Sequence, residues 1–259
     1  MGIIDTHAHV TYKDLVGRID EIVTNALSHN VTKILCVCCT KEEALKAIEI
    51  ANQYDIFDCA FGYHPEDVDR LEDHDLSELR SILTDPHMIA LGEIGLDYHY
   101  TKENKEAQKD LFIRQIQLAN ELDLPILIHM RDATLDTLEI LKQYPCRGIM
   151  HCFSGSLETA KICVKLGYYI SFAGPLTFKN AKDAPQVCEW VPLDRIFVET
   201  DSPFLTPHPF RGKQNEPAYT HITFEKVCEI KQIDAETLMK QMEENYYTLF
   251  KKAKRNESN

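Results

Sequence analysis

The sequence predicts a (β/α)₈ barrel, and three observations support this fold class. Eight short runs rich in Ile, Val, Leu, Phe and Tyr recur along the chain, with amphipathic helical patterns between them. Several runs are almost continuously apolar, as strands are when both faces of a sheet are covered. The 259 residues also suit one barrel, which commonly takes about 250. We therefore expect a single domain over residues 1–259.

The predicted strands share a short, β-branched or aromatic composition. They are Gly2–Thr6, Lys33–Cys38, Ile56–Gly62, Met88–Gly92, Pro125–His129, Gly148–Cys152, Tyr168–Phe172 and Arg195–Glu199. A doubly wound open sheet is the alternative architecture. It is disfavoured because no G-x-G-x-x-G motif follows the first strand.

The predicted helices carry apolar residues at mixed spacings of three and four. They are Asp14–His29, Lys41–Asn52, Asp75–Thr84, Lys105–Leu122, Ala133–Gln143, Ser156–Leu166, Ala181–Trp190, Tyr219–Ile230 and Asp234–Phe250. Thr40 with Glu43 forms a capping-box pattern at a helix start. Gly167 is typical of a residue that ends a helix. The basic tail 251–259 is expected to be disordered and solvated.

Composition narrows the function classes. The formal net charge is −13, which opposes broad, nonspecific coating of nucleic acid, because phosphate binding depends on Lys and Arg. No secretory signal precedes the first strand, and no apolar run is long enough for a transmembrane helix. Nine cysteines without a paired C-x-x-C motif are typical of buried thiols in a reducing compartment. We expect a cytoplasmic protein without a membrane partner.

Six side chains that could bind a metal lie where predicted strands end. They are His7, His9, Glu93, His129, His151 and Asp201. The carboxyl ends of barrel strands all meet on one face, so ligands from five strands would converge there. The sequence therefore predicts a metal centre and, with it, a hydrolase.

The spacing of these residues indicates how they could share metals. His7 and His9 are two apart on a strand, so both imidazoles point to the same face. Asp5 has the same register and would be an outer partner of a ligand or pack low in the barrel. Six ligands exceed the four of one tetrahedral ion, and two ions bridged by Glu93 are the economical arrangement. Asp201 could both hold a metal and accept the proton of a water molecule, with Glu199 as a competing ligand.

The ligand types limit the metal. A set of four histidines and two carboxylates suits Zn, Mn, Mg, Co or Ni rather than a Cys-rich structural zinc site. Two such ions polarise a phosphoryl or carbonyl oxygen and lower the pKa of bound water. Glu93 and Asp201 are accordingly the predicted catalytic residues.

Groups that could hold an anionic substrate follow the same strands. Arg131 lies two residues after His129, and Arg211 lies in the loop after the eighth strand. His64 ends the third strand. Tyr98 could stack on a nucleic-acid base, as could Phe178, although aromatic residues in barrel loops commonly serve packing. We predict His64, Arg131, Arg211 and Tyr98 as substrate-binding residues.

At this point the chain resembles a known family, the TatD family of metal-dependent deoxyribonucleases within the amidohydrolase-like superfamily. The resemblance runs from IIDTHAH to ENYYTLF and rests on DTHAH, GYHPE, GEIGLDYHY, IHMRDA, HCFSGS, FKNA, ETDSPFLTP and RGKQNEP. It implies a (β/α)₈ fold, two divalent cations and hydrolysis of DNA phosphodiesters, often from a 3′ end.

The resemblance also implies how the ligands divide between the two ions. One ion would be held by His7, His9, Glu93 and Asp201, and the other by Glu93, His129 and His151. All six positions are filled in this chain. Substrate choice does not follow from the resemblance, because the loops GPLTFKN and HPHPFRGK vary within the family.

Three functions remain open at this stage. The leading one is a monomeric, metal-dependent DNase. It would hydrolyse single-stranded DNA or a 3′ end as a 3′–5′ exonuclease. The second is a D-aminoacyl-tRNA deacylase or another ester or amide hydrolase on the same barrel. Many barrel amidohydrolases bridge their metals with a modified Lys at the end of the fourth strand, where this chain has Glu93. The third, a non-catalytic binding protein, would need missing ligands or a large apolar patch.

Overall fold

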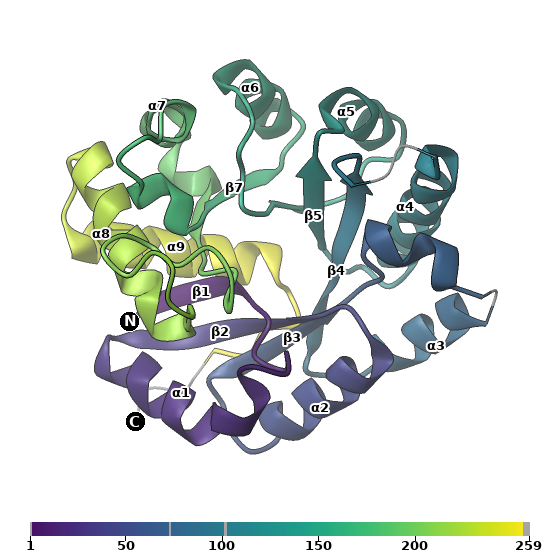
Figure 1. Ribbon diagram of the computed structural model, residues 1–259, viewed down its shortest axis with the longest axis horizontal. Coiled ribbons are helices and arrows are strands. Elements are labelled where there is room, and N and C mark those ends of the chain that lie inside the picture. Colours follow the sequence, from purple (N-terminus) through teal and green to yellow (C-terminus); the bar gives the residue numbers. More distant parts are fainter. Residues whose placement is uncertain (1, 73, 101–102, 256–259) are drawn as a thin grey trace.

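The computed structural model describes residues 2–72, 74–100 and 103–255. Within them, eight parallel strands form one sheet in the order β1 to β8. The strands are β1 (Ile3–Ala8), β2 (Val31–Cys38), β3 (Phe57–Phe61), β4 (Met88–Asp97), β5 (Ile126–Arg131), β6 (Gly148–Met150), β7 (Tyr169–Phe172) and β8 (Ile196–Val198). Sequential order and parallel pairing confirm the predicted barrel (Figure 1).

The barrel closes between its first and last strands. Ala8 forms an isolated parallel bridge with Ser202, just beyond β8. The amide of Asp201 donates to the His7 carbonyl at 2.9 Å, and the amide of His9 donates to the Ser202 carbonyl at 2.8 Å. Closure thus depends on the same short segments that carry three predicted metal ligands.

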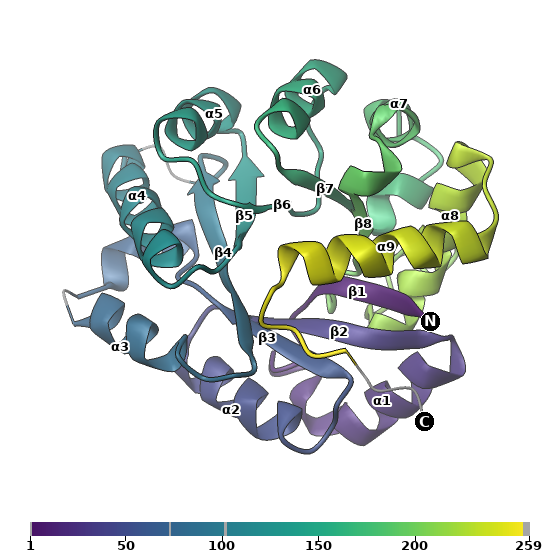
Figure 2. The ribbon, with the colours of Figure 1, turned by 180° about the vertical axis from the view of Figure 1, so that it is seen from behind.

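Helices cover the outside of the barrel (Figure 1). They are α1 (Ile19–Ser28), α2 (Lys41–Ala51), α3 (Asp75–Ile82), α4 (Lys105–Glu121), α5 (Thr134–Gln143), α6 (Leu157–Lys165), α7 (Asp183–Trp190), α8 (Thr220–Lys231) and α9 (Ala235–Leu249), with the 3₁₀ turns η1 (Val16–Arg18), η2 (Pro65–Arg70), η3 (Gly174–Thr177), η4 (Leu193–Arg195) and η5 (Pro217–Tyr219). Figure 2, the view from behind, has α9 in the foreground, with the chain that follows it running past β2 and β3.

Local sequence explains where several elements begin and end. Thr40 accepts from the Glu43 amide in a full capping box at the start of α2, as predicted. Gly167 follows α6 with φ 94°, a conformation that favours glycine. The helix expected from Asp14 starts later, at Ile19, because a turn and η1 precede it. None of the described helices combines the length and apolar character needed to cross a membrane.

Part of the expected disordered tail lies against the barrel. The Lys252 ammonium donates to the backbone carbonyls of Leu83 at 3.1 Å and Met88 at 3.4 Å. The neighbouring Lys251 contacts the Asp123 carboxylate at 3.0 Å. Residues 251–255 are therefore held by specific contacts, and the remainder of that predicted tail lies outside the described residues.

Candidate metal centre

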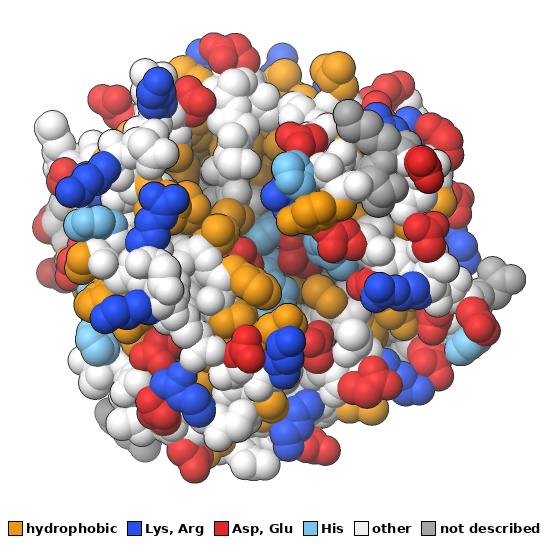
Figure 3. Space-filling view, viewed as in Figure 1, with side chains coloured by type: hydrophobic (Ala, Val, Ile, Leu, Met, Phe, Trp, Pro, Cys, Tyr) orange, Lys and Arg blue, Asp and Glu red, His pale blue; other side chains and the backbone are white. Residues whose placement is uncertain are grey.

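The six predicted ligands meet on the face that Figure 1 presents to the reader. In Figure 3, histidine side chains form the floor of a central hollow, with acidic and hydrophobic side chains around it. The potential ligand atoms form three groups that share residues, and within each group all the atoms lie within 4.8 Å of one another. They are His7–His9–Asp201, His7–Glu93–His151 and His64–Glu93–His129. Residues far apart in the chain are thus joined into one cluster, as the barrel predicts.

His7 near the end of β1 and His9 directly after it, called the β1 histidines below, face each other and two carboxylates. The Nε2 atoms of His7 and His9 are 3.2 Å apart. His7 Nε2 lies 3.3 Å from Glu93 Oε2, and His9 Nε2 lies 3.6 Å from Asp201 Oδ1. Alternation along β1 therefore turns both imidazoles toward one point, as expected.

Glu93 stands between the two halves of the cluster. Its Oε2 faces the β1 pair, whereas its Oε1 lies 2.6 Å from His129 Nδ1 and 2.7 Å from His151 Nε2. The side chain is only 6% exposed. Each carboxylate oxygen thus serves a different pair of histidines, which is the geometry that a bridging ligand requires.

The position of Glu93 in its strand differs from the prediction. We expected β4 to end at Gly92, but it continues to Asp97, so Glu93 lies inside the strand. The strand continues because the apolar pattern does, through Ile94 and Leu96, both fully buried. Gly95 permits this: a Cβ there would lie 2.0 Å from the His129 carbonyl oxygen, so only glycine lets β5 come this close.

Two buried acids outside the six predicted ligands lie behind the histidines. Asp97 Oδ2 is 2.9 Å from His129 Nε2, and Glu199 Oε1 is 3.1 Å from His151 Nδ1. Because a carboxylate can only accept, a ring nitrogen that faces one carries a hydrogen, and without a metal this holds for both nitrogens of His129 and of His151. If a cation replaced the hydrogens that face Glu93, those facing Asp97 and Glu199 would remain, and His129 Nδ1 and His151 Nε2 would be the ligand atoms. Asp97 and Glu199 thus set which nitrogen is available to a metal.

The Val37 carbonyl has the same effect on His9. It lies 3.0 Å from His9 Nδ1, so this nitrogen donates to the carbonyl, and Nε2, which faces Asp201, would be the nitrogen available to a metal. Glu199, considered from sequence as a rival to Asp201, is instead fully buried behind His151. The spacing of residues along the sequence could not reveal these partners, because each partner lies on a different strand from the histidine that it contacts.

Asp5 ties β1 to the segment that carries Asp201. Its carboxylate accepts from the Thr200 amide at 2.9 Å and from the Thr200 hydroxyl at 2.6 Å. Burial raises the pKa of Asp5 to about 7, against the hydrogen bonds from Thr200. Asp201 itself has φ 57°, a left-handed conformation that Asp tolerates better than most residues. Asp5 therefore packs beneath the site and positions the Asp201 turn.

The electrostatics of the cluster favour positive charge. Burial raises the pKa of Glu93, but the imidazoles of His151, His129 and His7 outweigh it and hold this pKa well below its usual range. Burial lowers the pKa of His9, whereas hydrogen bonding to Asp201 raises it to about 9. The buried carboxylates thus remain anionic and stabilise cations between them.

This donor set fits divalent metal ions. Imidazole nitrogens and carboxylate oxygens from several strand ends converge within contact distance of one another, and a bound cation could replace the hydrogens that they share. His7 Nδ1 and Glu199 Oε2 are buried without a hydrogen-bond partner among the described residues. Mixed N and O ligands suit Zn, Mn, Co or Ni, and Mg where water completes the shell.

Of the predicted substrate-binding residues, His64 lies deepest in the site. Its Nε2 is 3.9 Å from Glu93 Oε1, and its Nδ1 accepts from the Glu66 amide at 3.3 Å. We therefore assign the hydrogen to Nε2, which makes His64 a donor toward the cluster rather than a ligand. Burial, the largest influence, lowers the pKa of His64 to about 4.

The other three predicted substrate-binding residues differ in exposure. Arg131 and Arg211 are exposed and lie over aromatic rings, 4.9 Å from Tyr100 and 4.4 Å from Phe178. Tyr98 is only 4% exposed, and its hydroxyl donates to Asp136 at 2.7 Å. The structure does not bring Tyr98 into the site, because the side chain turns toward α4 and α5, with Lys105 over its ring.

A barrel with a histidine–carboxylate centre on its C-terminal face defines the class of barrel hydrolases that carry metals there. The family model described as TatD related DNase matches residues 4–251 of this chain. The chain therefore belongs to the TatD family.

Relatives agree over nearly the full length. The chain is 42% identical to the metal-dependent hydrolase YabD of Bacillus subtilis, over 96% of this chain and 99% of that protein. It is 38% identical to the metal-dependent hydrolase YcfH of Escherichia coli K12, over 96% of each. The crystal structure of YjjV, a TatD homologue from the same organism, matches with a TM-score of 0.90 and 30% identity, covering 96% of this chain and 98% of that one.

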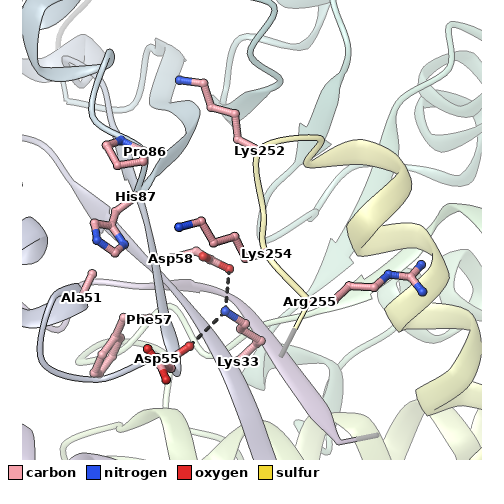
Figure 4. A pocket seen from close by; sticks show the side chains of 10 residues that line it. All are labelled: Lys33, Ala51, Asp55, Phe57, Asp58, Pro86, His87, Lys252, Lys254 and Arg255. Atoms are coloured by element: carbon pink, nitrogen blue, oxygen red, sulfur yellow. Dashed lines mark hydrogen bonds and ion pairs between the residues drawn. The ribbon is translucent and has the colours of Figure 1, made fainter. Parts of the chain in front are cut away.

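A second charged region lies at the opposite end of the barrel. A cavity of about 260 Å³ is lined there by the starts of β2 and β3 and by the C-terminal segment (Figure 4). Lys33 and Asp58, each 6% exposed, form an ion pair at 3.3 Å. The Lys33 ammonium also donates to the Asp55 carbonyl at 3.0 Å, and the Tyr246 hydroxyl donates to Asp58 at 2.7 Å. These buried charges are paired with one another.

Proposed function

We propose that this protein is a metal-dependent deoxyribonuclease that hydrolyses phosphodiester bonds of single-stranded DNA, acting from a 3′ end with two divalent cations. The observation that carries this proposal is the division of Glu93: one oxygen faces the β1 histidines and the other faces His129 and His151. A bridging carboxylate is what a two-metal site needs, and paired ions suit displacement at a phosphoryl group.

The ligand sets follow from these contacts. His7, His9, Glu93 and Asp201 would hold one ion, and Glu93, His129 and His151 would hold the other. When bound, the metals would supply Lewis acidity and lower the pKa of a bound water molecule. We also propose that the protein is cytoplasmic, which its free cysteines support, and that it acts as a monomer.

The protein's own groups would then position the substrate and move the proton. The Asp201 carboxylate, beside His9, is placed to accept a proton from the attacking water. His64, with its hydrogen on Nε2, would donate to an oxygen of the phosphate. Arg131 and Arg211 are the exposed cations that could neutralise flanking phosphates, which suits an acidic chain that binds only a short segment.

The test is a comparison of substrates at equal metal loading. Single-stranded DNA, an aminoacyl-tRNA carrying a D-amino acid and a simple carboxylic ester are each incubated with Mg²⁺ or Mn²⁺, for the wild type and for Asp201→Asn. We expect DNA to be the preferred substrate, with kcat reduced at least about 10²-fold in the variant. Faster turnover of the ester bond, or unchanged DNA cleavage by Asp201→Asn, would contradict the proposal.

A further inference from the structure

A second cavity opens on the same face as the candidate metal centre. It has a volume of about 230 Å³ and lies between the loops after β6 and β7 and the first turn of α7. Its walls are mainly apolar and its rim is polar. The apolar walls are Phe153, Phe172, Pro175, Leu176 and Phe178. The exposed rim residues are Ser154, Asn180, Lys182 and Asp183.

Part of the lining of this cavity adjoins, along the chain, residues of the candidate metal centre. Cys152 lines it and directly follows His151. The carbonyl of Phe172, another lining residue, accepts from the amide of Glu199 at 3.0 Å. The peptide link between His151 and Cys152 and the hydrogen bond from Glu199 to Phe172 therefore fix the position of the cavity relative to the candidate metal centre.

A cation and a second loop lie next to the lining residue Phe178. The Arg211 guanidinium lies 4.4 Å from the centre of the Phe178 ring. The Thr177 hydroxyl accepts from the His208 amide at 2.8 Å, which joins the loop after β7 to the loop after β8. An anionic group held by Arg211 would therefore have an aromatic ring and an apolar cavity immediately beside it.

We infer that this cavity is the subsite for the base of the 3′-terminal nucleotide, with Phe178 as its stacking surface and Arg211 beside the adjoining phosphate. The inference rests on the proposed function. The volume is below the roughly 300–1,000 Å³ of cavities that enclose a whole small-molecule ligand, so it suits one ring system. Apolar walls favour a neutral, flat group, and stacking on an aromatic ring accepts any base.

The experiment compares two single-stranded oligonucleotides that differ only in whether the 3′-terminal residue carries a base or is abasic. With Mn²⁺ present, we expect wild-type kcat/KM to be about 5- to 150-fold lower for the abasic substrate, as loss of one stacked base predicts. Phe178→Ala should reduce this ratio to about twofold or less, mainly by slowing the reaction of the substrate that has a base. Ala181→Trp, which fills the cavity from its edge, should have the same effect while retaining Phe178.

Phe204→Ala is the matched control. Phe204 is 47% exposed and lies near His9, with ring centres 6.3 Å apart, but it does not line the cavity. It should leave the ratio unchanged. Equal wild-type rates on the two substrates, or equal losses on both in Phe178→Ala, would overturn the subsite while leaving DNA hydrolysis intact. Absence of hydrolysis of either substrate would overturn the proposed function instead.

Discussion

The two ends of the barrel treat buried charge in opposite ways. At the N-terminal end, Lys33, Asp58 and Tyr246 pair with one another, and the Lys33 ammonium also binds a backbone carbonyl. At the C-terminal end, carboxylates and imidazoles from several strands converge on a common centre. Loss of one partner from a buried ion pair is costly to the fold, whereas ligand atoms that converge are retained for binding and chemistry. The two ends should therefore respond differently to mutation.

The largest expected effect is on catalysis at the C-terminal end. Glu93→Gln keeps the shape of the side chain but removes the charge that both ligand sets share. We expect kcat/KM on DNA to fall on the order of 10⁴-fold, about 5.4 kcal/mol. The free energy of unfolding of the metal-free protein should fall less than in Asp58→Ala at the other end, because the amide of Gln can still hydrogen-bond the surrounding imidazoles. Kinetics on DNA measure the loss of activity, and urea unfolding of the metal-free protein measures the loss of stability. A loss in unfolding free energy as large as that of Asp58→Ala would contradict the contrast between the ends.

The next largest effect is on stability at the N-terminal end. Asp58→Ala leaves the buried Lys33 ammonium without its ion-pair partner, so we expect a loss of about 3–5 kcal/mol in the free energy of unfolding. Asp55→Ala is the control, because the Asp55 side chain is exposed and only its carbonyl contacts Lys33. It should cost about 0.5 kcal/mol or less. The folded fraction of Asp58→Ala should keep wild-type kcat, and a reduced kcat would show that the ends are coupled.

A smaller effect is expected behind the ligands. Glu199→Gln weakens the preference for a hydrogen on His151 Nδ1, so metal affinity should fall about 10- to 100-fold. The measurement is competition with a chelating dye, with the exposed Glu189→Gln on α7 as control. Unfolding of the metal-free protein should change little. Unaltered affinity in Glu199→Gln would mean that His151 needs no partner to present Nε2.

The smallest effect concerns the C-terminal segment. Lys252→Ala removes two hydrogen bonds to backbone carbonyls, and we expect a loss of about 1 kcal/mol in unfolding free energy. Lys254→Ala, at an exposed position two residues on, should be nearly neutral. Equal stability of the two variants would indicate that the contacts of Lys252 contribute nothing measurable.

The sequence predicted the fold well, because each buried strand is a short apolar run and each helix keeps its amphipathic period. That the six predicted ligands lie together could be foreseen for the same reason: in a parallel barrel, residues at strand ends must meet. The extent of β4 was underestimated, although Ile94 and Leu96 continue its apolar pattern beyond Glu93. Asp97 was missed entirely and Glu199 was weighed only as a ligand, since their contacts with histidines join different strands and leave no spacing signal. Tyr98 follows a strand like a rim residue, but its neighbours on α4 and α5 bury it.

β4 has a consequence for how this molecule can change over evolutionary time. Glu93 and Asp97 lie four residues apart on the same strand, and Gly95 between them touches the backbone of His129. One inserted or deleted residue between them would turn one of the two carboxylates to the opposite face of the sheet. The loops after β7 and β8 can lengthen or shorten without such a penalty. During evolution, substrate specificity can therefore change through insertions and deletions in these loops, whereas the length of β4 must stay constant.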